Sequence, residues 1–107
     1  MGYKTAVDIF EAIADPTRRR IIELVSVAEL SAGDIAREFD VSRPAVSRHL
    51  RVLRDAGVVR CRVQAQRRLY RVDTAALDEL DGWIAKTRRF WSERLDRLDR
   101  HLEGKTR

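Results

Sequence analysis

Arginine is the residue type in this chain whose number and position most clearly indicate a function. Nine arginines lie between positions 42 and 72, beside a single acid, Asp55. That segment has a net charge of +8 and the whole chain +5, so the remaining residues sum to −3. Such a concentration of guanidinium groups indicates a surface that binds a polyanion. The apolar residues of the segment form a core stripe instead of the broad lipid-facing surface of a membrane helix, which favours nucleic acid over a membrane.

Residues 42–57 are predicted to form one helix. Ser42 is a natural N-cap, Pro44 fits the first turn, and Gly57 can adopt the left-handed conformation that ends a helix. An apolar stripe would face the core and polar side chains would project from the other faces: Val46, Leu50 and Leu53 on the first, and Ser47, Arg48, Arg51 and Asp55 on the others. Such a helix fits the major groove of DNA, although scattered arginines also occur on ordinary solvated helices.

The preceding segments supply the partner of this helix. Asp15 and Pro16 begin one helix, and Ser31 and Asp34 have the spacing of a capping box at the start of another. A turn of about three residues at 40–42 then leads into the arginine-bearing helix. Two helices joined by so short a turn predict a helix-turn-helix over residues 31–56. We expect the arginines at 18–20 to be solvated and ion-paired; contact with phosphate is the alternative.

After Gly57 the apolar period changes from that of a helix to that of a strand. Residues 58–63 and 68–72 alternate, with Val59, Cys61 and Val63 on one face, which predicts a hairpin over residues 58–72. Cys61 is expected to be a small core residue. A helix-turn-helix followed by a basic hairpin is a winged helix, and the polar tip of the hairpin could reach a phosphate backbone.

The two ends of the chain predict a dimer. Residues 5–14 suggest a short helix that is apolar on two sides, and residues 74–103 a long helix with a near-heptad seam. A seam of about 25 residues exceeds what so small a body can cover, so we expect it to pair with a second copy; packing along its own domain is the alternative. The predicted interface consists of Val7, Phe10, Ile84, Trp91, Leu95, Leu98 and Leu102.

Length and composition bound the remaining possibilities. The 107 residues indicate a single, mostly α-helical winged helix-turn-helix domain, with about five helices plus a two-stranded wing. No apolar run is long enough to span a bilayer and the N-terminus has no signal-peptide pattern, so we expect a cytoplasmic protein. Two histidines, one cysteine and no glycine-rich phosphate loop offer no nucleophile–base pair, which argues against an enzyme.

Several stretches together resemble the ArsR/SmtB family of winged-helix repressors, and within it the SdpR-like branch. They are residues 14–22 (ADPTRRRII), residues 42–50 (SRPAVSRHL), Leu53, residues 56–59 (AGVV) and the Phe90–Trp91 pair. The resemblance extends over nearly the whole chain. It implies a homodimeric bacterial repressor that binds inverted repeats in promoters.

The chain departs from the metal-sensing members of that family. Where those members have a Cys-x-Cys pair, this sequence has Ser31 and Gly33, and the last helix offers only His101. Zinc needs about three or four ligands, so we expect neither a metal nor another cofactor.

The expected DNA contacts divide by role. Arg43 or Arg48, early in the recognition helix, should read guanine, and His49 should pack or contact phosphate. The full predicted set is Ser42, Arg43, Ser47, Arg48, His49, Arg51, Arg62, Arg67 and Arg68. Sequence-neutral DNA binding and a protein partner on the last helix remain alternatives. The sequence does not identify an inducer, whether a protein or a small molecule held near the last-helix aromatics.

Overall fold

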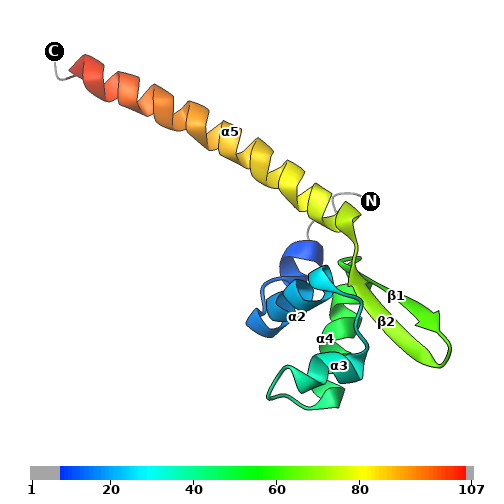
Figure 1. The fold of residues 1–107 in the computed structure, drawn as a ribbon. Coiled ribbons are helices and arrows are strands. Elements are labelled where there is room, and N and C mark those ends of the chain that lie inside the picture. Colours follow the sequence, from blue (N-terminus) through cyan, green and yellow to red (C-terminus); the bar gives the residue numbers. More distant parts are fainter. Residues whose placement is uncertain (1–7, 106–107) are drawn as a thin grey trace. The chain divides into compact units, whose positions relative to one another are not determined.

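The computed structural model describes residues 8–105, which divide into two units between Leu77 and Asp78. The first unit contains helical residues 8–12, α2 (Pro16–Val27), α3 (Ala32–Arg37), α4 (Arg43–Asp55), β1 (Val59–Gln64), β2 (Arg67–Val72) and the first turn of α5 (Thr74–Lys105) (Figure 1). The second unit is the remainder of α5. Five helices and a two-stranded hairpin within the described residues confirm the predicted fold class.

The caps predicted from the sequence begin the helices of the first unit. Asp15, Ser31 and Ser42 precede α2, α3 and α4, and each side chain accepts a hydrogen bond from a first-turn amide. Ser31 and Asp34 form a reciprocal capping box in which both hydrogen bonds measure 3.1 Å. Gly57 follows α4 with φ at +79°, the left-handed conformation that glycine adopts without steric cost. These local signals explain where each helix starts and why the turn between α3 and α4 is short.

The core of the first unit forms where these helices meet the hairpin. The predicted stripe of α4 is buried, since Val46, Leu50 and Leu53 are at most 1% exposed. The other buried apolar side chains come from every element of the unit: Ile9, Ala12, Ile21, Val25, Ile35, Ala56, Val58, Val59, Leu69 and Ala76. Burial of one face of α4 fixes the helix in the body and leaves its opposite face in solvent.

The hairpin has a register that pairs Gln64 with Arg67 and leaves residues 65–66 as its turn. The connector between α2 and α3 adds a bridge to it, because Leu30 and Tyr70 exchange two backbone hydrogen bonds of 3.1 and 2.8 Å. The predicted burial of Val63 is wrong: it is 67% exposed, at a part of β1 where the neighbouring strand residues are also exposed.

Two other strand positions differ from the expected alternation. Cys61 is only half-buried, opposite Tyr70. Leu69, which the alternation of the second run did not single out, is the buried residue of β2. Strand β2 lies between β1 and the Leu30 connector and also contacts α2, so its own neighbours decide which residue is covered.

The turn of the hairpin contains a residue that is unfavourable for its backbone. Ala65 has φ at +56°, which costs an L-residue about 1–2 kcal/mol, whereas glycine adopts it freely. We therefore expect Ala65→Gly to raise the free energy of unfolding by about 0.5–1 kcal/mol, because relief of strain exceeds the added freedom of the unfolded chain. Thermal melting followed by circular dichroism measures this, with Ala75→Gly in helical α5 as the control that should destabilise. A lower melting temperature for Ala65→Gly would contradict the claim that the backbone of Ala65 is strained.

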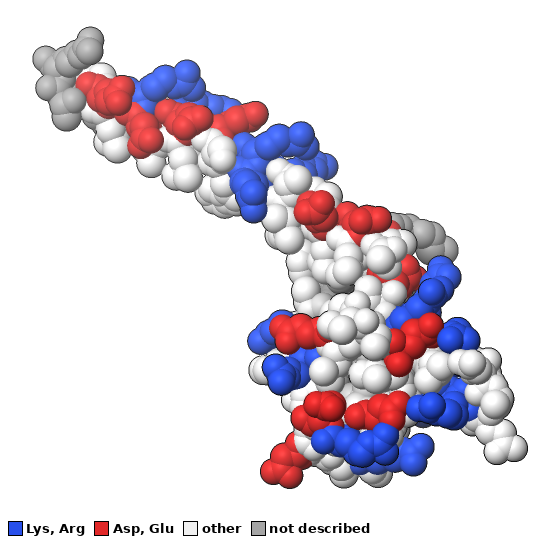
Figure 2. All heavy atoms as spheres, viewed as in Figure 1, with Lys and Arg blue, Asp and Glu red and all other residues white. Residues whose placement is uncertain are grey.

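In the second unit, α5 has an apolar side whose large side chains are about half-exposed. The five α5 side chains of the predicted interface (Ile84, Trp91, Leu95, Leu98 and Leu102) are each between 44% and 57% exposed. Charged atoms lie along one side of the helix and uncharged atoms along the other (Figure 2). Of the other predicted interface residues, Phe10 is half-buried and Val7 lies outside the described residues. In residues 8–105 no helix has the length and apolarity needed to cross a membrane.

Candidate nucleic-acid interface

The polar side chains of α4 point in different directions around the helix axis, which we describe relative to the buried stripe. Arg48 lies midway between Val46 and Leu50, so its side chain leaves the opposite side of the helix and is the outermost arginine there. Arg43 and Arg51 lie on the flank between these two faces and are also exposed. The helix therefore offers one outward guanidinium and a row of flanking ones.

That flank forms one wall of a groove of about 920 Å³ whose other walls are the start of α3 and the outer half of the hairpin. The groove is lined by six arginines, Arg37, Arg43, Arg51, Arg54, Arg67 and Arg68, and by two acids, Asp34 and Asp55. It brings together five of the predicted DNA-binding residues, Arg43, Ser47, Arg51, Arg67 and Arg68. The predicted residues Ser42, Arg48, His49 and Arg62 lie outside its lining. The net charge of the groove suits a phosphate backbone.

Acidic side chains engage three of the hairpin arginines. Arg60 Nε donates to Asp73 Oδ2 at 2.8 Å, Arg62 Nε to Glu29 Oε2 at 2.6 Å, and Arg67 Nη2 to Asp34 Oδ2 at 2.8 Å. The hydrogen bond from Arg62 is the main cause that lowers the pKa of Glu29, and the same contact raises the pKa of Arg62. Arg62, which belongs to the predicted DNA-binding set, thus donates to a carboxylate of the same chain.

Other arginines of the segment keep their donors available. Within the described part of the chain, no hydrogen bond or ion pair engages the guanidinium groups of Arg43, Arg48, Arg51, Arg54 and Arg68. Basic and acidic side chains lie side by side over the end of the body that contains α3 and α4 (Figure 2). The basic surface is therefore interrupted by carboxylates, and these five arginines have guanidinium groups available to meet phosphates or bases.

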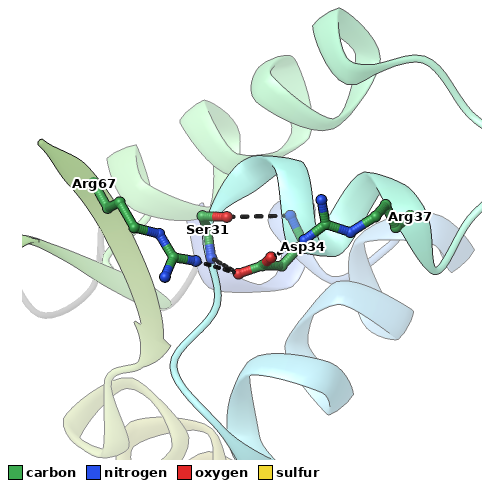
Figure 3. Close-up of polar contacts among 4 residues, drawn as sticks. All are labelled: Ser31, Asp34, Arg37 and Arg67. Atoms are coloured by element: carbon green, nitrogen blue, oxygen red, sulfur yellow. Dashed lines mark hydrogen bonds and ion pairs between the residues drawn. The ribbon is translucent and has the colours of Figure 1, made fainter.

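Asp34 is one of the two acids that line the groove. Its carboxylate accepts from the Ser31 amide and forms ion pairs with Arg37 of α3 and Arg67 of β2 (Figure 3). Hydrogen bonding to Ser31, followed by the charges of Arg67 and Arg37, lowers the pKa of Asp34. Asp34 therefore stays negative at neutral pH and joins α3 to the hairpin.

Arg20 forms an ion pair with Glu23, as expected of residues 18–20, whereas Arg18 and Arg19 instead donate to backbone carbonyl groups. Arg18 donates from Nε to the carbonyl of Ala12 at 2.6 Å, and Arg19 from Nη1 to the carbonyl of Ile13 at 2.9 Å. Carbonyl groups at a helix end have no partner within the helix, and these arginines satisfy them. Arg18 Nη1 also lies 3.5 Å from Nδ1 of His49, which is half-buried.

The predicted set omits several residues that line the groove, among them Asp34, Arg37 and Arg54. Arg54 could have been found, because residues 43, 47, 51 and 54 follow helical spacing along one flank of α4. Asp34 could not, since it had a sufficient explanation as a capping residue.

The described residues contain no group of three or more His, Cys, Asp or Glu side chains that could hold a metal ion. The Ser31 hydroxyl accepts a hydrogen bond from the Asp34 amide at 3.1 Å. The side chains at the start of α3 therefore build a helix cap.

Comparison with known proteins adds an independent line of evidence. A family model described as "Bacterial regulatory protein, arsR family" matches residues 15–60. The chain is 38% identical to the transcriptional repressor SdpR of Bacillus subtilis, with 72% of this chain and 86% of that protein covered. It is 40% identical to the HTH-type transcriptional regulator Rv2034 of Mycobacterium tuberculosis, with 87% and 84% covered.

A solved structure supports the same grouping. The ArsR-like transcriptional regulator from Rhodococcus sp. RHA1 superposes with a TM-score of 0.86 at 27% identity, over 95% of this chain and 94% of that one. All three of these proteins are described as regulators or repressors of transcription. Their descriptions agree with the prediction of a regulator rather than an enzyme.

Proposed function

We propose a repressor function for this chain, which belongs to the ArsR family of bacterial regulatory proteins and is a transcriptional regulator. It represses transcription as a homodimer bound to an inverted repeat in promoter DNA. SdpR, to which it is similar, is named a repressor. The bound protein would then exclude RNA polymerase from the promoter. We place this activity in the cytoplasm, where bacterial promoter DNA lies.

The observation that supports the proposal most strongly is the arrangement of α4. One face of the helix is fixed in the core while Arg48 projects from the opposite face, and a basic groove runs along one flank. The major groove admits an α-helix, and the rim of that groove is lined by phosphates. A helix inserted there would place Arg48 at base edges and the flanking arginines at the backbone.

The proposed roles follow from this placement. Arg48 reads a guanine through a bidentate contact, and Arg43 is the alternative reader. Arg51, Arg67 and Arg68 line the groove and contact phosphates, which fixes register without reading sequence. The hydroxyls of Ser42 and Ser47 supply further contacts near the start of α4. Arg62 donates to Glu29, and a phosphate contact there requires it to use another of its N–H groups.

The half-exposed apolar side of α5 supports a dimer formed by a second copy of this chain. A near-heptad seam of half-exposed leucines, with charged residues on the other side, is typical of helices that pair. Two-fold symmetry demands an inverted repeat, whose half-sites we expect about 10 base pairs apart. Nuclease footprinting on DNA from upstream of its own gene tests this. Two symmetric protected half-sites are expected, and protection of every sequence alike would instead indicate sequence-neutral binding.

Arg67 tests the phosphate role of the hairpin. Arg67→Ala should weaken operator and random DNA by about the same factor and reduce the slope of log affinity against log salt by ~1, because one phosphate contact is lost. Fluorescence anisotropy over a salt series measures both quantities. Arg60→Ala is the matched control, since Arg60 is also a hairpin arginine in an ion pair but lies outside the groove. An unchanged salt slope for Arg67→Ala would remove the hairpin from the phosphate contacts.

A further inference from the structure

Little holds the outer end of the hairpin against the body. Residues 62–68 are all exposed, so no buried apolar side chain anchors the turn. The backbone bridge between Leu30 and Tyr70 lies three residues inward from Arg67, and the Arg62–Glu29 pair is also farther from the turn. Arg67 is the first residue of β2, directly after the turn, and its contact with Asp34 joins it to α3.

Asp34 is a fixed anchor for this contact. Its backbone belongs to the first turn of α3, and its side chain closes the capping box with Ser31. The Asp34 side chain is 21% exposed, whereas that of Arg67 is 61% exposed. The ion pair thus joins a well-held carboxylate to a side chain that would otherwise move in solvent (Figure 3).

The contact leaves most of Arg67 available. A guanidinium has five N–H donors in a planar fork, and Asp34 occupies one through Nη2. The remaining donors can meet a phosphate without breaking the ion pair. An arginine already held in place loses less side-chain entropy when it binds.

From these observations, and resting on the proposed function, we propose that Asp34 is a positioning residue for DNA binding: it holds Arg67 at the edge of the groove so that Arg67 meets a phosphate of the duplex. Asp34 itself touches no DNA. Its effect passes through Arg67, so the value of Arg67 for DNA affinity depends on the carboxylate at position 34.

A double-mutant cycle measures that dependence. DNA affinity is compared among the intact protein, Asp34→Asn, Arg67→Ala and the double variant. The asparagine keeps a side-chain oxygen that can accept the capping-box hydrogen bond. Loss of the negative charge near DNA changes the affinity of both variants that carry Asp34→Asn equally, so this effect cancels in the cycle. The affinity lost on Arg67→Ala should be smaller in the Asp34→Asn background by roughly 2- to 12-fold, which corresponds to the entropy of one immobilised side chain.

The sign of the coupling separates the possible roles. If Arg67→Ala lowers DNA affinity by the same factor in both backgrounds, or lowers it in neither, the proposal is overturned. If Arg67→Ala lowers DNA affinity more in the Asp34→Asn background, Asp34 competes with phosphate for Arg67. The cycle Arg60→Ala with Asp73→Asn is the control, because that pair lies outside the groove and should show no coupling. If the intact protein binds no duplex, the proposed function fails instead.

A measurement on the free protein tests the same idea without DNA. Order parameters from ¹⁵N relaxation at residues 64–67 should fall in Asp34→Asn and in Arg67→Ala, and stay unchanged in Arg60→Ala. Circular dichroism melting of each variant reports whether α3 remains folded. Unchanged order at the hairpin turn in the folded Asp34→Asn variant would overturn the positioning role.

Discussion

Leu98→Asp is expected to yield a monomer whose affinity for the operator is about 100- to 10,000-fold lower, because the second half-site no longer adds to binding. Leu98 lies on the apolar side of α5 and is 51% exposed in the single chain. In a two-fold interface the substitution occurs twice, and each copy buries an unpaired carboxylate. This is the largest effect that the proposed assembly predicts.

Sedimentation equilibrium measures the oligomeric state, and anisotropy on one-half-site and two-half-site duplexes measures binding. Arg97→Ala changes the adjacent residue and should leave the dimer intact. Leu98 belongs to the second unit, so the secondary structure of the first unit should be retained. A Leu98→Asp protein that sediments as a dimer would place the interface elsewhere.

Arg48→Ala is expected to relax specificity and to cost ~1–3 kcal/mol on the operator, because a bidentate contact to guanine distinguishes it from the other bases. Random DNA should weaken much less. The structure strengthens this expectation, since Arg48 is exposed, has no ion pair within the described residues, and projects directly away from the core.

Competition anisotropy with single-base operator variants identifies the position that Arg48 reads. Arg20→Ala is the matched control, because it removes the same charge from α2, where Arg20 faces Glu23 and lies outside the groove. Equal weakening of operator and random DNA by Arg48→Ala would make Arg48 a phosphate contact and leave Arg43 as the candidate reader.

Most of the fold could be predicted from the sequence because its signals are local. Caps at Asp15, Ser31 and Ser42 act within one helical turn, and Gly57 ends α4 through its own backbone conformation. The hairpin alternation was a weaker guide: Val63 lies where no element covers it, and the burial of Leu69 depends on neighbours distant in the chain.

The interface was predictable in its residue types and less so in its partners. Helical spacing predicted the exposed arginines of α4, since that needs only the position of the core stripe. The ion pairs Arg62–Glu29 and Arg67–Asp34 each join residues 33 positions apart, so no local sequence pattern predicts them. Arg18 shows the same limit, because its acceptors are carbonyls of the preceding helix, which no side-chain pattern reveals.

The most direct test of sequence-specific binding is fluorescence anisotropy on labelled DNA from immediately upstream of its own gene, against scrambled DNA of equal length, at physiological salt. Specific binding typically exceeds non-specific binding by about 10³-fold or more, and we expect a difference of that size with two protomers per site. If that duplex contains no site, a selection from genomic fragments supplies one. Equal affinity for selected and scrambled DNA, falling steeply with salt, would contradict a sequence-specific repressor.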